Sequence, residues 1–174
     1  MFDPRRYFAA RRPNHKSVRV LFVCFANICR SPTAEGVLRQ YVKEAGLSER
    51  IMVDSAGSAD YHAGEPPDPR ACLVAANRGY DLSRLRARQI NEHDFARFDY
   101  ILAMDVKNLR ALKRYCPPEY GFKVTLFTDY CSRAVSTIVD PYNGGLDEFV
   151  RMLDVMEDAA SGLLQHLRRE IGDQ

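Results

Sequence analysis

Apolar residues follow two different spacings along the chain, and the two spacings alternate. Residues 18–25 are nearly all apolar and rich in valine, which is typical of a strand buried on both faces of a parallel sheet. In residues 33–45 the apolar positions recur every three or four residues and stop at Gly46, which predicts an amphipathic helix. A first strand is therefore followed closely by a first helix.

The same alternation continues to the end of the chain. Asp68, Asn91 and Asp105 are helix-capping residue types, and each stands at the start of a segment with helical spacing. Strands are expected at residues 51–53, 100–103 and 124–127, and helices at 69–77, 91–97, 105–115 and 146–171. Strands that alternate with helices favour a single α/β domain of three layers, in which helices flank a central four-stranded parallel sheet.

Length and composition are those of an ordinary globular domain. The chain has 174 residues, of which 46% are hydrophobic and 28% charged, so one domain with a core is expected and a disordered chain is not. The longest apolar run, residues 20–26, is far shorter than the roughly 20 residues that a membrane-spanning helix needs. With no recognisable signal peptide, the sequence predicts a soluble, cytoplasmic protein without a membrane span.

Positive charge is concentrated at the N-terminus. Residues 1–20 hold six basic residues and one acidic residue, a formal charge of +5, so the other residues carry −3 of the total of +2. We therefore divide the chain into a basic N-terminal extension, residues 1–17, and a domain, residues 18–174. A basic arm can bind nucleic acid or an anionic membrane surface, or act in targeting. Because the domain is net acidic, the sequence favours a solvated extension and no nucleic-acid partner.

Cysteine is present five times, an odd number, in a chain long enough to fold without disulfide bonds. The residues are Cys24, Cys29, Cys72, Cys116 and Cys131. No pair of Cys-x-x-Cys motifs occurs, and the four histidines are scattered. The sequence therefore predicts free thiols in a reducing compartment, and it predicts neither a metal site nor a cofactor.

The segment between the first strand and the first helix carries the candidate chemistry. Residues 24–32 read CFANICRSP, so Cys24 is followed by five residues and then by Arg30. A loop of this length can wrap around a tetrahedral oxyanion, with backbone N–H groups and the positive end of the helix directed at it. The planar guanidinium of Arg30 matches two phosphoryl oxygens. The spacing thus predicts a phosphate-binding loop.

The same surroundings favour the thiolate form of Cys24, which is the nucleophilic form. Ser31 can donate its hydroxyl to that thiolate, and Asn27 tolerates the left-handed backbone that such a loop needs. A cysteine that ends a buried strand is often only an apolar filler. Its position at a strand-to-helix turn favours the catalytic interpretation here. No Walker motif and no GxGxxG motif is present, so nucleotide binding is not indicated.

Together with five further blocks, this loop resembles the low-molecular-weight protein tyrosine phosphatases, from about residue 18 to the last helix. The blocks are DSAGS at 54–58, GEPPDPRA at 64–71, ARQI at 87–90, FDYILAMD at 98–105 and DPYNGG at 140–145. The resemblance implies hydrolysis of phosphotyrosine through a cysteinyl-phosphate intermediate, without a cofactor. It also implies a phosphotyrosine-containing protein as partner, a tyrosine kinase among the candidates, a loop that a phosphate or sulfate ion can occupy, and a monomer or weak dimer.

The resemblance assigns a role to Asp140, which an Asp-Pro pair alone does not reveal, because such pairs are usually loop formers. Asp140 matches the general acid that protonates the leaving phenolate, a contribution worth about 10²–10⁴-fold. Tyr61 and Tyr142 match the aromatic residues that flank the phosphotyrosine ring. Phe25 and Ile28 lie within the loop and are expected to line the same cleft. The expected phosphate- and substrate-binding set is Phe25, Ala26, Asn27, Ile28, Cys29, Ser31, Tyr61 and Tyr142.

Two positions in the loop bear on specificity and regulation. The apolar Ile28 resembles tyrosine-specific members, whereas related phosphoarginine phosphatases often carry threonine there. The spacing of Cys29 from Cys24 matches members in which the two form a reversible disulfide under peroxide. A small residue that merely completes the loop explains Cys29 equally well.

Two departures from the family pattern affect the loop. Ala26 stands where glycine is usual, so a positive φ would be strained there, and we expect a compatible right-handed or extended conformation or a slightly altered loop. Leu85 stands where many members have a histidine that supports the loop asparagine. We therefore expect the hydrogen bonds behind Asn27 to rest on Ser55 alone, with ordered water as a further support.

Two other functions fit the same fold and loop. A thiol-linked arsenate reductase needs two further cysteines on a mobile segment, but residues 73–115 contain none, and Cys116 and Cys131 lie fifteen residues apart. A non-catalytic phosphotyrosine-binding module needs neither a nucleophile nor an acid, so the presence of Cys24 and Asp140 argues against it.

Overall fold

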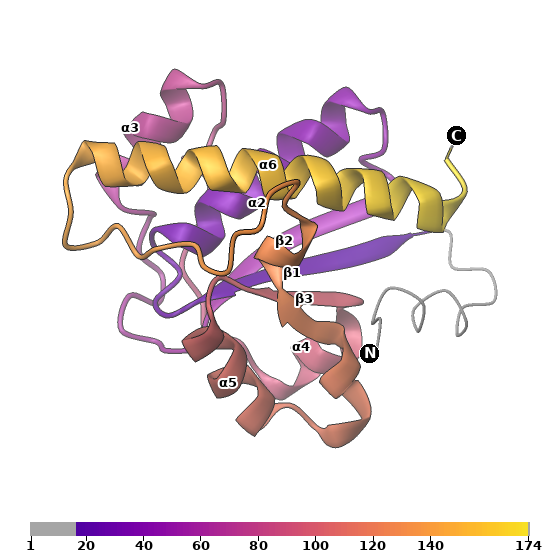
Figure 1. Cartoon of the computed structure of the whole chain (residues 1–174). Helices are drawn as coiled ribbons and strands as arrows, with labels where there is room; N and C mark the ends of the chain where they lie inside the picture. The colour runs from indigo at the N-terminus through magenta and orange to yellow at the C-terminus, as the bar shows by residue number, and fades with distance from the viewer. Residues whose placement is uncertain (1–16, 174) are drawn as a thin grey trace.

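Four parallel strands form the centre of the molecule, in a computed structural model that describes residues 17–173 (Figure 1). They are β1 (Val18–Cys24), β2 (Ile51–Gly57), β3 (Tyr100–Ala103) and β4 (Val124–Leu126), in the order β2-β1-β3-β4. This confirms the predicted sheet. The predicted basic extension, residues 1–17, lies outside the described residues except for Ser17, so the division of the chain at residue 18 stays a prediction.

Helices cover both faces of the sheet, which confirms the predicted three layers. In Figure 1, α2, α3 and α6 lie on one side of the sheet and α4 and α5 on the other. Their bounds are α2 (Arg30–Glu44), α3 (Pro69–Asn77), α4 (Glu92–Arg97), α5 (Val106–Tyr115) and α6 (Leu146–Ile171). The side chains of β1 alternate between two cores, because successive residues of a strand point to opposite faces. Val20 and Phe22 belong to the larger core, and Leu21 and Val23 to the smaller one.

Strand register determines where the functional loops meet. Because β1 is flanked by β2 and β3, its central residue Leu21 pairs with both Asp54 and Ile101. All four strands run in the same direction, so their carboxyl ends share one edge of the sheet. Open parallel sheets bind ligands at this edge. The loop that follows Cys24 therefore lies where a ligand site is expected.

Element boundaries differ from the sequence prediction at a few points. β2 extends to Gly57 rather than ending at Val53, because residues 54–57 pair with β1 despite their low strand propensity. α2 begins at Arg30 rather than residue 33, since Pro32 is tolerated in the first turn. Two short 3₁₀ helices, η1 (Pro118–Lys123) and η2 (Phe127–Tyr130), were not predicted, and η2 takes the last residue of the expected strand 124–127.

The predicted helix caps are confirmed. Asp68 accepts a hydrogen bond from the N–H of Arg70, and Asp105 accepts one from the N–H of Asn108. Asn91 forms a capping box with Asp94. Among residues 17–173, no helix has the length and apolar character to cross a membrane.

Candidate active site

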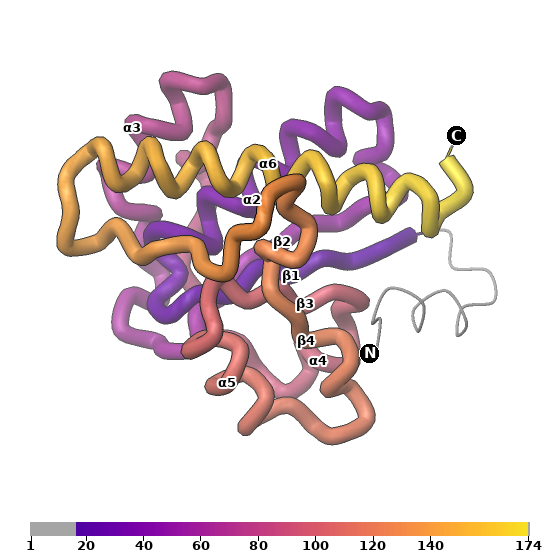
Figure 2. Tube along the Cα trace, in the orientation of Figure 1, coloured from indigo at the N-terminus to yellow at the C-terminus, as the bar shows by residue number. Residues whose placement is uncertain are grey.

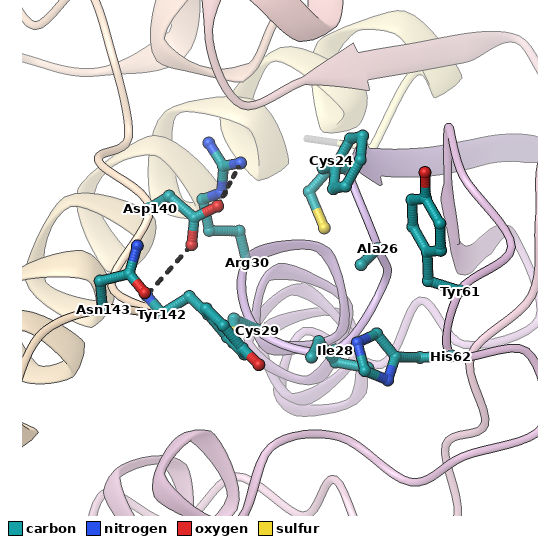
Figure 3. A pocket seen from close by; sticks show the side chains of 11 residues that line it. Cys24, Ala26, Ile28, Cys29, Arg30, Tyr61, His62, Asp140, Tyr142 and Asn143 are labelled. Carbon is teal, nitrogen blue, oxygen red and sulfur yellow. Dashed lines mark hydrogen bonds and ion pairs between the residues drawn. The ribbon is translucent and has the colours of Figure 1, made fainter.

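A cavity of about 290 Å³ opens at the carboxyl edge of the sheet, at the N-terminus of α2 (Figure 3). Its walls come from the loop after β1, from the segment after β2 and from the segment before α6. The lining residues are Cys24, Phe25, Ala26, Ile28, Cys29, Arg30, Tyr61, His62, Asp140, Tyr142 and Asn143. The structure therefore brings together residues separated by more than a hundred positions in the sequence.

The loop between β1 and α2, residues 25–29 (the β1–α2 loop), turns sharply at Asn27. Asn27 has φ of 58° and is the only non-glycine residue with positive φ in residues 17–173. Asparagine is among the few residues that tolerate this left-handed conformation. Ala26 has no positive φ, which confirms the expectation that alanine adopts a compatible conformation there. The side chain of Cys29 does not cap α2, so it leaves the amides of the first helical turn to an anion.

Ser31 lies next to the candidate nucleophile. Its Oγ is 3.0 Å from the Sγ of Cys24 and 3.1 Å from the carbonyl oxygen of Ala56. The amide of Asn27 donates to the same Oγ at 2.8 Å. A hydroxyl has one proton to donate, so it can serve either the sulfur or the carbonyl. When Cys24 is a thiolate, only Ser31 can supply the proton of their hydrogen bond, and the hydroxyl then stabilises the anion.

Asn27 itself is held from three sides, and the prediction that its support rests on Ser55 alone is wrong. Its Nδ2 donates to Ser55 Oγ at 2.9 Å as well as to Ser31, and its Oδ1 accepts the backbone N–H of Arg88 at 3.0 Å. Ser55 in turn donates to Glu35 at 2.6 Å. Glu35 reaches this position because it follows Ser31 by one helical turn and so lies on the same face of α2. Leu85, by contrast, packs against the apolar core.

Glu35 is a buried carboxyl group behind the loop. Burial raises its pKa above the usual value, and the hydrogen bond from Ser55 and the charge of Arg39 oppose that rise. Its second partner is Arg39, at 2.7 Å on the same helix. Sequence reasoning missed Glu35, although its position four residues after Ser31 in an amphipathic helix was a usable signal.

Arg30 is buried and its guanidinium is oriented by three acceptors. Nη1 donates to Asp105 at 2.6 Å and to the carbonyl oxygen of Ile138 at 3.1 Å, and Nη2 donates to Asp140 at 3.1 Å. Asp105 also caps α5, so one carboxylate fixes both a helix and the arginine. The functional position of Asp105 was not predicted; its place at the carboxyl end of β3, the strand beside β1, was the signal available.

Asp140 faces the cavity from the segment before α6 (Figure 3). Its side chain is 50% exposed, and its Oδ1 accepts the N–H of Tyr142 at 3.2 Å in a tight turn. The predicted nucleophile, arginine and acid therefore surround one space. The side chains of Asn27, Ser31 and Ser55 are buried and do not line the cavity.

Aromatic rings form the rim. The rings of Phe25 and Tyr61 lie 5.7 Å apart on one side, and Tyr142 lies on the other side, beside Asp140 (Figure 3). Phe25, Tyr61 and Tyr142 are 51%, 74% and 48% exposed, so their faces are available to a ligand ring. The buried Ile28 contributes apolar surface between them.

Comparison with known proteins agrees with this geometry. A family model described as low molecular weight phosphotyrosine protein phosphatase matches residues 19–173. The chain belongs to this family. It is 48% identical over 136 residues to the low molecular weight phosphotyrosine protein phosphatase of Schizosaccharomyces pombe, a match covering 77% of this chain and 86% of that protein. It is 43% identical over 157 residues to the low molecular weight protein-tyrosine-phosphatase of Streptomyces coelicolor, covering 88% and 95%.

Solved structures lead to the same family. A protein tyrosine phosphatase from Entamoeba histolytica aligns with a TM-score of 0.84 and 38% identity, covering 91% of this chain and 100% of that chain. A low molecular weight phosphotyrosine phosphatase from Vibrio cholerae aligns with a TM-score of 0.82 and 33% identity, covering 87% and 97%. Membership in this family makes the chain a protein tyrosine phosphatase, a phosphoric monoester hydrolase.

Within the phosphatase site, Cys29 is buried and lines the same cavity as Cys24. Burial raises the pKa of its thiol, and the negative charges of Asp68 and Cys24 raise it further. Cys29 is therefore a protonated thiol at neutral pH, and all five cysteines are free. Its role as a redox partner of Cys24 stays a prediction.

Two other residues of the phosphatase site were missed by sequence reasoning. His62 and Asn143 line the rim of the cavity. His62 Nδ1 is 2.6 Å from the carboxylate of Glu65. His62 lies in no sequence block that marks it, and Asn143 lies in the DPYNGG block without a role assigned to it, because only the folded chain places these segments beside the cavity.

Proposed function

We propose that this phosphatase hydrolyses phosphotyrosine through a cysteinyl-phosphate intermediate, with Cys24 as nucleophile, Arg30 as phosphate ligand and Asp140 as general acid and base. One observation carries the proposal. The sulfur of Cys24, the guanidinium of Arg30 and the carboxyl of Asp140 converge on a single cavity at the N-terminus of α2. These are the three groups that phosphoryl transfer to a thiolate requires.

In the first step the thiolate of Cys24 attacks phosphorus, and an S–P bond forms as the P–O bond to the tyrosine breaks. The bonding electrons leave on the phenolic oxygen, and protonated Asp140 donates a proton to it. Tyrosine has a pKa of about 10, so this proton transfer matters for the rate. Arg30 and the first amides of α2 stabilise the charge on the phosphoryl oxygens.

In the second step the Asp140 carboxylate accepts a proton from water, whose oxygen attacks phosphorus. The S–P bond breaks, inorganic phosphate leaves and the Cys24 thiolate returns. The hydroxyl of Ser31, 3.0 Å from the sulfur, stabilises that thiolate as it leaves. Asp140 is therefore protonated again at the end of the cycle, as it was at the start.

The walls of the cavity support an aromatic phosphate ester as substrate. Phe25 and Tyr61 on one side and Tyr142 on the other can enclose a planar ring, and Ile28 offers no polar group to a guanidinium. We therefore assign phosphotyrosine, carried by a protein, rather than phosphoarginine. Turnover of matched phosphotyrosine and phosphoarginine peptides tests this, and a preference for phosphoarginine would overturn it.

Two variants test the mechanism. Cys24→Ser should abolish turnover of an aryl phosphate, and Asp140→Ala should lower kcat by about 10²-fold or more, because each removes one of the reacting groups. Cys72→Ser is the matched control, since Cys72 lies outside the cavity, and it should keep wild-type activity. Normal turnover by Cys24→Ser would refute the assignment.

The placement of the remaining cysteines does not support the alternative function, a thiol-linked arsenate reductase. Cys116 packs in the smaller core, whereas Cys131 packs against the larger core on the other face of the sheet. Arsenate-dependent oxidation of thioredoxin by the protein would revive that alternative.

We also place the protein in the cytoplasm, as a monomer or weak dimer acting on a phosphotyrosine-containing protein. Five free cysteines support a reducing compartment. Cell fractionation and analytical ultracentrifugation of the full chain test the two statements, and recovery in an oxidising compartment or as a tight oligomer would contradict them.

A further inference from the structure

The catalytic acid is carried by an exposed segment, residues 139–145, which we call the acid loop. Val139 and Tyr142 are 67% and 48% exposed. The trace in Figure 2 shows the segment between η2 and α6 running to the same side of the molecule as the β1–α2 loop. Inside the acid loop, Gly144 donates its N–H to Pro141 at 2.9 Å. Such local bonds shape the turn, but they do not fix its position relative to Cys24.

Arg30 is one anchor of the acid loop, through its 3.1 Å bond to Asp140. Because the guanidinium of Arg30 is also the group assigned to bind the substrate phosphate, its hydrogen bond to Asp140 would compete with the phosphoryl oxygens. The chain just before the acid loop is held at Ile138, whose N–H donates to Met104 at 2.9 Å and whose carbonyl oxygen accepts from Arg30 at 3.1 Å. The part of the loop that follows Asp140 has a different contact.

Arg70, at the start of α3, supplies that contact. Its Nη1 donates to the carbonyl oxygen of Gly144 at 2.9 Å, and its Nη2 donates to that of Tyr142 at 3.0 Å. Tyr142 is two residues from Asp140. The guanidinium also lies 4.6 Å from the ring centre of Phe149, a buried residue of α6, and 5.8 Å from that of Tyr142. Arg70 does not line the cavity and therefore does not act on the substrate.

Asp68 fixes the other side of the arginine. Its Oδ1 accepts Nε of Arg70 at 3.0 Å and its Oδ2 accepts Nη2 at 2.8 Å. The hydrogen bonds from Arg70 hold the pKa of Asp68 below its usual value, so the carboxyl is ionised. The backbone N–H of Asp68 donates to the carbonyl oxygen of Ile28 at 2.8 Å, which joins the pair to the β1–α2 loop.

A continuous connection therefore runs from the loop that binds phosphate, through Asp68 and Arg70, to the acid loop. We propose that Arg70 is a positioning residue that sets the place of the Asp140 carboxyl relative to the phosphoryl group. The proposal rests on the assignment of Asp140 as the general acid. Arg70 makes four hydrogen bonds to one carboxylate and two carbonyl oxygens, which the planar guanidinium can make together, whereas an ammonium group has only three N–H donors and can replace only part of them.

The experiment compares kcat/KM for two aryl phosphates that differ in leaving group. Phenyl phosphate has a leaving group with a pKa of about 10 and needs the acid. The dinitrophenolate of 2,4-dinitrophenyl phosphate is far less basic and leaves readily without protonation. For Arg70→Gln we expect kcat/KM to fall about tenfold or more with phenyl phosphate and less than about twofold with the dinitrophenyl ester. Arg70→Lys should show the same selective loss to a smaller extent.

Arg78→Gln is the matched control. Arg78, at the other end of α3, pairs with Asp154 at 2.6 Å and with Glu157 at 2.7 Å, both on α6 and outside the acid loop. Arg78→Gln removes an arginine and its ion pairs between α3 and α6. The dependence of kcat/KM on the leaving group should stay unchanged in this variant. Inhibition of each variant by vanadate reports whether the phosphate-binding loop is intact.

The outcomes separate this proposal from the mechanism. If Asp140→Asn itself shows no greater loss with phenyl phosphate, the assignment of the acid fails. If Asp140→Asn shows that loss but Arg70→Gln and Arg70→Lys lose activity equally with both esters, Arg70 is only structural and the proposal is overturned. The double variant Arg70→Gln/Asp140→Asn should be no slower than Asp140→Asn alone, and additive losses would also overturn it.

Discussion

Asn27 shows how much a single residue contributes to this site. It combines a left-handed backbone with hydrogen bonds to Ser31, Ser55 and the N–H of Arg88. The backbone shapes the turn around the anion, and the side chain ties the turn to β2 and to Ser31, which serves the nucleophile. Glycine could supply the first property and not the second.

Two substitutions separate these contributions. Asn27→Ala should lower the free energy of unfolding by about 2–4 kcal/mol, because it strains the backbone and removes the buried hydrogen bonds. Asn27→Gly removes the same bonds without the strain, so it should be more stable than Asn27→Ala by about 1 kcal/mol. Urea unfolding measures both. Equal stability of the two variants would show that backbone strain contributes little.

Glu35 makes stability depend on pH. Burial raises its pKa in the folded chain above its usual value of 4.5, so the folded state binds a proton more tightly than the unfolded state. This contribution to stability is present below about pH 4.5 and is lost as the pH rises through the raised pKa.

Glu35→Gln removes that titration. Its free energy of unfolding, relative to wild type, should therefore increase above about pH 4.5, by up to about 1.4 kcal/mol per pH unit while the carboxyl titrates. Urea unfolding from pH 4 to pH 8 measures the difference. Glu44→Gln, which removes an exposed carboxyl from the same helix, controls for the loss of charge. A constant difference across this range would contradict the prediction.

At the scale of elements, the close approach of α6 to η2 depends on one glycine. A Cβ at Gly162 would lie 2.0 Å from the carbonyl oxygen of Tyr130, which is backbone and cannot rotate away. Gly36 in α2 is also crowded, but its nearest neighbour, at 2.3 Å, is the end of the Leu82 side chain. Side chains adjust more easily than backbone.

Alanine at these two positions should therefore have different effects. Gly162→Ala should destabilise the protein by about 1–3 kcal/mol, because overpacking outweighs the better helix propensity of alanine. Gly36→Ala should change stability by less than about 1 kcal/mol, since Leu82 can move while the helix gains propensity. Thermal or urea unfolding measures both, and a stable Gly162→Ala variant would show that η2 can shift away from α6.

The ends of a helix or strand could be predicted from the sequence where they depend on the spacing of nearby apolar residues. The bounds of α6 agree with the sequence prediction, because its apolar stripe is long and regular. β2 was predicted too short, because Asp54, Ser55 and Gly57 are poor strand formers that become strand only by pairing with β1. This error mattered for the site, since Ser55 lies in the missed part.

At the scale of the whole molecule, net charge says little about the substrate. The site that receives a phosphate is built from residues 24–31 and Asp140. Attraction of the phosphate is therefore local, through one arginine and one helix end. Residues 1–16 carry much of the positive charge of the sequence, but none of the site residues belongs to this segment.

Deletion of residues 1–16 should leave kcat/KM for a phosphotyrosine peptide within about twofold of the full chain, since no site residue is removed. Steady-state kinetics at low and at physiological salt measure this. A tenfold fall that disappears at high salt would show instead that the arm attracts substrates electrostatically.

The sequence by itself determined the succession of strands and helices along the chain, the helix caps, and the Cys24–Arg30 loop between β1 and α2. These features depend on periodicity and on residues a few positions apart, so they leave a local signal. The family resemblance then added Asp140. Only the tertiary structure decided how Asp105 holds Arg30, how Glu35 supports Ser55, and how Arg70 grips the acid loop. Arg30 and Asp105 lie 75 positions apart, Glu35 and Ser55 lie 20 apart, and Arg70 and Gly144 lie 74 apart. Such pairings leave no periodic trace, because they form only when the strands and helices pack together.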